Sequence, residues 1–213
     1  MFRLIKIVFN AFIIVLAFIG FNAIGGEKYI EPIKVAINNH IQTYKDSITK
    51  KLGDFSGLDE EFQIDKAVNF MGYNAMIAAH KASGQKMIII DSGKKTLLTE
   101  EDIQSDEVEK KLKTLSEKFR YQGASVKEIK VTQRGKLDIY GKNVPYVKFE
   151  ASVSKLPVSD IAGIIASVKT SDGSEKLALS VSENKKYSQL ITKEFFKGVN
   201  EGGNKESKRG TEK

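Results

Sequence analysis

The N-terminal end of the chain contains a long uncharged run that cannot lie on the surface of a globular domain. The run extends from Ile7 to Ile24, a stretch of 18 residues, and the only charged side chains before it are the basic ones of Arg3 and Lys6. As an α-helix it would span roughly 27 Å, close to the ~30 Å hydrocarbon core of a bilayer. Because the run is apolar on every side, we expect residues 1–26 to be a membrane-directed segment.

Two interpretations of this segment remain open. It is either an uncleaved signal anchor or a signal peptide cut after Gly25, where Ala23 and Gly25 supply the small residues that a signal peptidase reads. We favour the anchor, because the run exceeds the usual apolar region of about 7 to 15 residues in a signal peptide. The purely basic N-terminus predicts a single-pass protein of a bacterial cytoplasmic membrane, with the remainder on the extracytoplasmic, periplasmic side.

An amphipathic stalk helix is expected next, over Glu31 to Leu52, with a linker that completes residues 27–58. Gly25-Gly26 breaks the first helix, and Pro32 suits the first turn of the second. Seven apolar residues then recur with an 11-residue period, which keeps them on one stripe of a straight helix: Ile30, Ile33, Ile37, Ile41, Tyr44, Ile48 and Leu52. We favour packing of this stripe on the protein's own domain. A protein partner or a membrane surface is the alternative cover.

Residues 59–199 predict an α+β domain, a single antiparallel sheet flanked by helices. A short helix is expected around Phe62, Ile64 and Val68. The strands Tyr73 to His80 and Met87 to Ile90 form a hairpin whose second strand is buried on both faces. One helix should follow the start signal of Thr99 and Asp102 and carry Ile103, Val108, Leu112, Leu115 and Phe119 on its apolar side.

A meander of five strands and a final helix complete the expected domain. The strands are Val126 to Thr132, Lys136 to Tyr140, Pro145 to Val153, Ile161 to Val168 and Lys176 to Ser182, and the helix is Tyr187 to Val199. Short turns between successive strands require antiparallel pairing. Residues 200–213 are rich in Gly, Lys and Glu and predict a disordered tail.

Two stretches of this domain resemble the PsbP-like fold of the extrinsic photosystem II subunit and its bacterial relatives. In Gly141 to Glu150 a turn feeds a long alternating strand, and Lys176 to Ser182 leads into a helix with the pair Phe195-Phe196. The resemblance covers Tyr73 to Val199. It implies a non-enzymatic accessory or assembly factor at a membrane, and it assigns no functional residue to this chain. The anchor and the stalk depart from the family pattern.

No catalytic or metal-binding pattern emerges from the residues. The chain has no Cys and two His, His40 and His80, which no spacing joins into a metal pair. The segment Ile88 to Thr96 imitates a phosphate-binding loop, but Ile88 stands where the motif needs Gly, and Lys95 stands where it needs Ser or Thr. The acids from Glu100 to Glu109 fit the start of a helix, where they complement its dipole. We therefore predict no catalytic residue, cofactor or metal.

The charge of the soluble part excludes nucleic acid as a partner. Without Arg3 and Lys6, residues 7–213 carry 32 basic and 27 acidic residues, a net +5 that is interleaved along the chain. We expect a membrane-anchored extracytoplasmic binding or assembly protein, whose protein partner would bind the stalk stripe or the sheet face. A lipid or small-molecule carrier would need an apolar cavity, and an enzyme would need a deep pocket lined by His80, Asp91 or Tyr73.

Overall fold

The computed structural model describes residues 46–70, 73–91, 93, 97–117, 125–154 and 159–202. The expected anchor, residues 1–26, and the stalk up to residue 45 lie outside these ranges. Within them, no helix combines the length and the apolar character that a membrane crossing requires.

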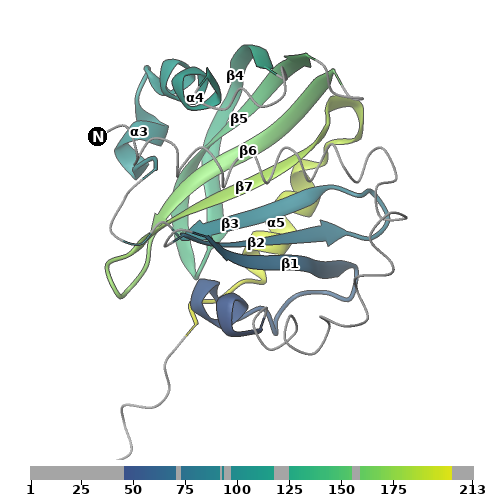
Figure 1. The fold of residues 1–213 in the computed structure, drawn as a ribbon, viewed down its shortest axis with the longest axis vertical. Helices are drawn as coiled ribbons and strands as arrows, with labels where there is room; N and C mark the ends of the chain where they lie inside the picture. The colour runs from purple at the N-terminus through teal and green to yellow at the C-terminus, as the bar shows by residue number, and fades with distance from the viewer. Residues whose placement is uncertain are drawn as a thin grey trace, which may run out of the picture.

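A seven-stranded sheet, antiparallel throughout, forms the centre of the domain (Figure 1). Its spatial order is β1-β2-β3-β7-β6-β5-β4, so the pairing of β3 with β7 joins the N-terminal strands to the C-terminal meander. The strands are β1 (Phe62–Phe70), β2 (Tyr73–His80), β3 (Lys86–Asp91), β4 (Ser125–Ile139), β5 (Lys142–Ser154), β6 (Asp160–Lys169) and β7 (Glu175–Glu183). The expected α+β class, the single antiparallel sheet and the β2–β3 hairpin are confirmed.

Helices cover both faces of this sheet, and each face has its own apolar core. The helices are α3 (Glu100–Gln104), α4 (Val108–Glu117), the short 3-10 helix η2 (Asn184–Lys186) and α5 (Gln189–Lys197), with a further helix at residues 46–52. One core gathers the apolar side chains of α5 and of helix 46–52, and the other gathers those of α3 and α4. Strand β3 contributes Met87 and Ile89 to the first core and Ile88 and Ile90 to the second, so it is buried on both faces as expected.

The expected helix around Phe62, Ile64 and Val68 is wrong, because this segment is the edge strand β1. A bulge between Ile64 and Lys66 inserts an extra residue into the strand. Phe62, Ile64 and Ala67 consequently face the α5 side, whereas Val68 faces the other side. The interrupted alternation imitates helical spacing and explains the error.

The single helix expected after Thr99 is two helices in the structure, α3 and α4. The expected capping box between Thr99 and Asp102 is confirmed. The Arg134 guanidinium donates to the carbonyls of Ile103, Gln104 and Ser105 at 2.9, 3.1 and 3.0 Å, which fixes the end of α3.

The first two expected strands of the meander are one strand, β4, which continues through Gly135. A Cβ atom at this position would lie 2.7 Å from Cζ of Tyr146, the residue opposite it on β5. Glycine therefore allows the tyrosine ring to pack on the strand, and it does not mark a turn here.

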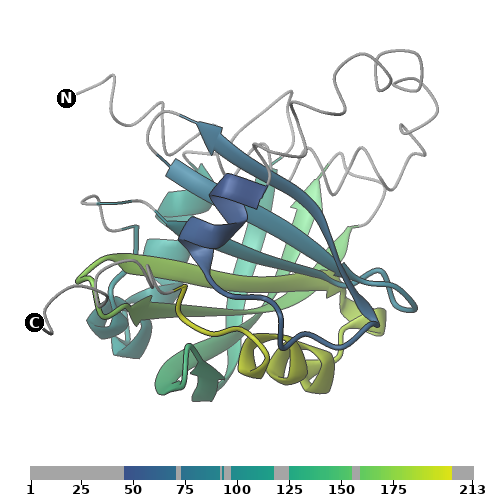
Figure 2. The same cartoon turned by 90° about the horizontal axis from the view of Figure 1, so that it is seen from below.

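The last turn of the expected stalk belongs to the core of the domain. Ile48 and Leu52 are 2% and 0% exposed and pack with Phe195 and Phe196. Beyond Leu52 the backbone of Asp54 pairs with that of Asn200, so the C-terminal segment runs beside the chain that leaves helix 46–52 (Figure 2). For Ile48 and Leu52 the favoured packing on the protein's own domain is confirmed, whereas Ile30 to Tyr44 lie outside the described residues.

Candidate functional site

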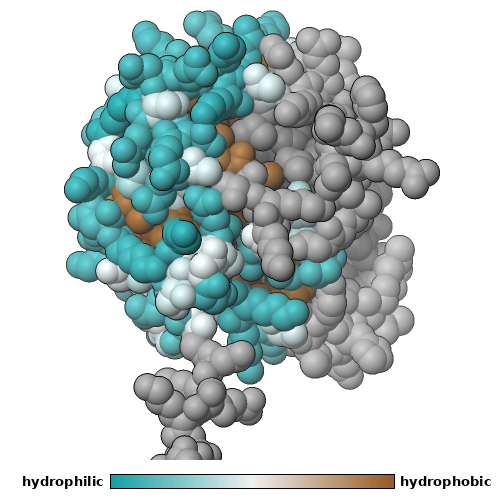
Figure 3. All heavy atoms as spheres, turned by 90° about the vertical axis from the view of Figure 1, so that its left-hand side faces the viewer, coloured by the Kyte–Doolittle hydropathy of each residue, from teal (hydrophilic) through white to brown (hydrophobic). Residues whose placement is uncertain are grey.

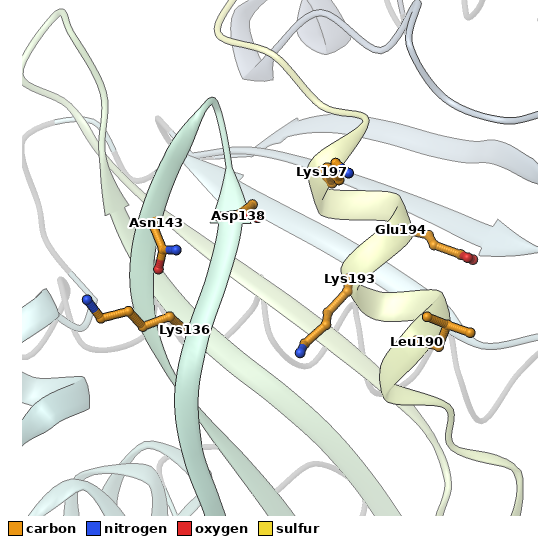
Figure 4. Close-up of a pocket in the computed structure, with 7 residues that line it drawn as sticks. All are labelled: Lys136, Asp138, Asn143, Leu190, Lys193, Glu194 and Lys197. Carbon is orange, nitrogen blue, oxygen red and sulfur yellow. The ribbon is translucent and has the colours of Figure 1, made fainter.

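An open groove lies between α5 and the hairpin that joins β4 to β5 (Figure 4). Its volume is about 280 Å³, and every side chain that lines it is exposed. These side chains are Lys136, Asp138, Asn143, Leu190, Lys193, Glu194 and Lys197. We call this feature the α5 groove.

The hairpin wall of the groove is formed by a tight turn at Tyr140-Gly141. Both residues have positive φ angles, 55° and 68°, as a two-residue loop with a type I′ turn requires. The turn places Asp138 directly opposite Asn143 in the strand register. The two exposed side chains therefore form one polar wall at the end of β4 and β5.

Helix α5 forms the other wall and shows two chemically distinct sides. Thr192, Phe195 and Phe196 are buried against the sheet. Residues 190, 193, 194 and 197 follow the spacing i, i+3, i+4 and i+7 and form the exposed stripe. In Figure 4, Lys193 extends from α5 toward β4, whereas Lys136 points across the hairpin and away from the helix.

A buried polar network holds the N-terminus of α5 in place. The Gln85 side-chain amide donates to the Ser188 carbonyl at 3.0 Å and to Thr192 Oγ1 at 2.8 Å, and Gln85 Oε1 accepts from the Ser188 backbone N–H at 2.8 Å. Tyr187 and Ser180 complete the network through Thr192. Burial raises the pKa of Tyr187 above its ordinary value. The position of the helix is thus fixed by satisfied hydrogen bonds.

The residues that would favour an enzyme do not meet in one pocket. Tyr73 and His80 lie at opposite ends of β2, and Asp91 lies opposite Asn74, near the Tyr73 end. The Tyr73 hydroxyl is buried and has no hydrogen-bond partner among the described residues, and burial raises its pKa. Asp91 accepts a hydrogen bond from the backbone N–H of Gly93 at 2.7 Å, a local turn contact.

His80 forms a polar row with Ser83 and Glu61 that sequence analysis did not predict. Its Nδ1 atom lies 3.0 Å from Ser83 Oγ, and its Nε2 atom lies 2.9 Å from Glu61 Oε2. The order of groups is that of a nucleophile, a base and an orienting carboxylate. However, the backbone N–H groups of Ser83, Gly84 and Gln85 all donate within the turn itself. These three N–H groups are therefore not free to bind an oxyanion. The contacts of His80 with Ser83 and Glu61 stabilise the β2–β3 turn.

Acidic side chains of α3 and α4 form hydrogen bonds and an ion pair within the domain. Asp102 accepts from the Thr99 backbone and pairs with Lys111, and the hydrogen bond from Lys111 is the main cause of its lowered pKa. Glu109 Oε1 accepts from the backbone N–H of Val131 on the outer strand β4 at 2.6 Å. Among the described residues, no group of three or more His, Asp or Glu side chains is arranged to hold a metal ion.

Lys176 is a buried cation that the sequence analysis placed only at the start of a strand. Its Nζ atom donates to the carbonyls of Lys51 and Leu52 at 3.0 and 3.3 Å and lies 5.2 Å from the centroid of the Tyr140 ring. Burial lowers its pKa. The alternation along β7 could have revealed it, because Lys176 shares a face with the buried residues Ala178 and Ser180.

The fold and the groove define an α+β domain with a seven-stranded antiparallel sheet and an open, lysine-lined surface site. No known protein-family model matches the chain, and a search of curated proteins finds no relative. Among solved structures, the chain is similar to the X-ray structure of a structural-genomics target from Chromobacterium violaceum, at 13% identity and a TM-score of 0.15. The match covers 65% of this chain and 63% of that protein.

Proposed function

We propose that this chain is a membrane-anchored, extracytoplasmic binding or assembly protein of a bacterial cytoplasmic membrane and that it is not a catalyst. The observation that carries the proposal is the uncharged run from Ile7 to Ile24, which precedes a domain with an exposed site. A tether of this kind confines the domain to the membrane surface, where its partner would be found.

The chemistry of the α5 groove supports binding. Its ionisable side chains are exposed lysines and carboxylates, which remain hydrated. Catalysis by electrostatic stabilisation requires groups that are preorganised and shielded from water. An open, charged groove instead suits the recognition of a charged surface.

The PsbP-like resemblance supports an accessory or assembly role of this kind. The shared feature is coarse, an antiparallel sheet with helices on its faces. It adds no site residue, so the role rests on the anchor and on the groove.

The two alternative functions would each require a different site. A lipid carrier would need an enclosed apolar cavity, whereas charged side chains dominate the lining of the α5 groove. An enzyme would draw on the row of Ser83, His80 and Glu61. A loss of function in a folded His80→Ala variant would favour the enzyme.

Site-directed labelling tests the proposed topology, because the chain contains no Cys of its own. A Thr114→Cys variant should react with a membrane-impermeant maleimide in intact spheroplasts, since Thr114 is exposed on α4. A Phe2→Cys variant should react only after the membrane is opened. Labelling of Thr114→Cys only after lysis would contradict the extracytoplasmic location.

A second experiment separates tethered binding from catalysis. Cells that rely on a plasmid copy of the gene should retain its function with His80→Ala or Asp91→Asn. They should lose it when residues 1–26 are replaced by a cleaved signal peptide, because the domain is then released. Loss of function in His80→Ala or Asp91→Asn, together with function of the released domain, would favour an enzyme over a binding protein.

A further inference from the structure

The outward stripe of α5 combines one exposed apolar residue with lysines. Leu190 is 66% exposed, and no other large apolar side chain whose exposure the structure describes is exposed. Lys193 and Lys197 follow at i+3 and i+7 on the same stripe. Within the described residues, neither Lys193 nor Lys197 forms an ion pair.

Further lysines surround this stripe. Lys148 lies on the same side of β5 as Tyr146. The Tyr146 hydroxyl accepts a hydrogen bond from Gln189 of α5 at 2.6 Å. The Nζ atom of Lys148 lies 5.6 Å from the centroid of the Tyr187 ring. Two more lysines belong to η2, which leads directly into α5. We define the α5 face as Leu190 with five lysines: Lys148, Lys185, Lys186, Lys193 and Lys197.

The α5 face carries a positive net charge. Three carboxylates accompany its five lysines, namely Glu183, Glu194 and Glu150, which lies on the same side of β5 as Lys148, and this leaves 5 − 3 = +2. The Gln85 network holds the helix that displays these charges. Because the surface is formed in advance, docking requires little additional ordering of the backbone.

The composition of the face distinguishes a lipid surface from a protein partner. Protein interfaces are enriched in aromatic residues and Arg and are depleted in Lys. Arg also suits the bidentate binding of individual carboxylates, whereas Lys is a hydrated point charge. Here all the basic residues are lysines, and the exposed apolar group is a solitary leucine. Lysines around an apolar side chain are typical of segments that rest on an anionic bilayer.

We infer that the α5 face docks on the anionic surface of a lipid bilayer, with Leu190 entering the boundary between head groups and acyl chains. The lysines contact lipid phosphates, and the leucine removes its apolar surface from water. This inference deepens the proposed function, because it names the surface on which the tethered domain rests.

A single tryptophan tests the inference in the full chain, which contains no Trp. A Leu190→Trp variant keeps an apolar side chain at this position, and Trp favours the membrane interface. In vesicles of phosphatidylcholine with about 30% phosphatidylglycerol, its emission should shift to the blue and be quenched by brominated acyl chains. Vesicles of phosphatidylcholine alone, or about 0.5 M salt, should abolish both effects.

Charge variants provide the matched comparison. Lys193→Gln with Lys197→Gln in the Leu190→Trp chain should lower the ratio of docked to undocked domain about 25-fold, at about fivefold for each lysine. Lys110→Gln with Lys113→Gln makes the same change in net charge on α4 and should leave the ratio unaltered. A Thr114→Trp chain should show no lipid-dependent emission.

Several results would overturn the inference. They are an unquenched Leu190→Trp in anionic vesicles, equal quenching in neutral vesicles, and quenching that survives loss of Lys193 and Lys197. A response to poly-glutamate without a response to vesicles would assign the face to an acidic protein. A different result is expected if residues 1–26 do not anchor the chain. The chain would then be washed from neutral vesicles, whereas the emission of Leu190→Trp would still be quenched in anionic vesicles.

Discussion

Two buried polar side chains, Gln85 and Lys176, attach helices to the sheet. Gln85 is 0% exposed and joins the β2–β3 turn to the start of α5. Lys176 joins β7 to the end of helix 46–52. Gln85 supplies an acceptor for the Ser188 backbone N–H, and Lys176 donates to the last carbonyls of helix 46–52.

Replacement of Gln85 should destabilise the domain strongly. In Gln85→Ala, the Ser188 backbone N–H loses its acceptor and a cavity replaces the buried amide, so we expect the free energy of unfolding to fall by about 3 kcal/mol. Urea unfolding of the full chain in mild detergent, followed by tyrosine fluorescence, measures the loss. Gln63→Ala, at an exposed position of β1, should change it by less than about 0.5 kcal/mol. Equal effects of the two changes would refute the role of the network.

Lys176 should make the unfolding free energy depend on alkaline pH. Burial lowers its folded-state pKa below 10.5, so the penalty for burying the charge is complete below the folded-state value and disappears as pH rises toward 10.5. The stability of the wild type relative to Lys176→Met should therefore increase with pH in that range. The buried tyrosines oppose stability at alkaline pH in both proteins, because their pKa values are raised, and the difference removes the contribution that the two proteins share.

The Lys176 prediction has a direct control. Lys127→Met, at an exposed position of β4, should show the same pH dependence as the wild type. A difference between wild type and Lys176→Met that is constant over the same pH range would contradict the prediction.

The strands were predictable where local chemistry agreed with tertiary structure. The alternation of Val147 to Val153 and the apolar run of β3 predict their strands, and the Thr99 capping box predicts the start of α3. The sequence could not predict β1, because its bulge interrupts the alternation that identifies a strand. It also could not show that Gly135 continues β4, since only the Tyr146 ring on β5 explains that glycine.

Gly163 of β6 offers a test of strand packing. A Cβ atom there would lie 2.3 Å from the Ser180 carbonyl oxygen and 2.7 Å from Cζ of Phe149, the residue opposite it on β5. Gly163→Ala should lower the free energy of unfolding by about 3 kcal/mol, because the sheet or the ring must move. Lys169→Ala, at the exposed end of the same strand, should have little effect. A neutral Gly163→Ala in the same urea assay would disprove the close packing.

At the scale of the described domain, both faces of the sheet are covered by apolar cores. On the side that carries α3, the surface of the described residues is largely hydrophilic, with apolar atoms in narrow strips (Figure 3). The α5 groove could not be predicted from the sequence, because it joins Lys136 and Asn143 to a helix about 50 residues later in the chain. The expected anchor is a local pattern, but it lies outside the described residues.

The central claim is that residues 1–26 hold this domain at a membrane. It is tested most directly by alkaline carbonate extraction of membranes from cells that make the full chain, followed by intact-mass measurement. The uncharged run from Ile7 to Ile24 predicts full-length protein in the membrane pellet. Recovery of a soluble form that begins at Gly26 would contradict the claim and identify residues 1–25 as a cleaved signal peptide.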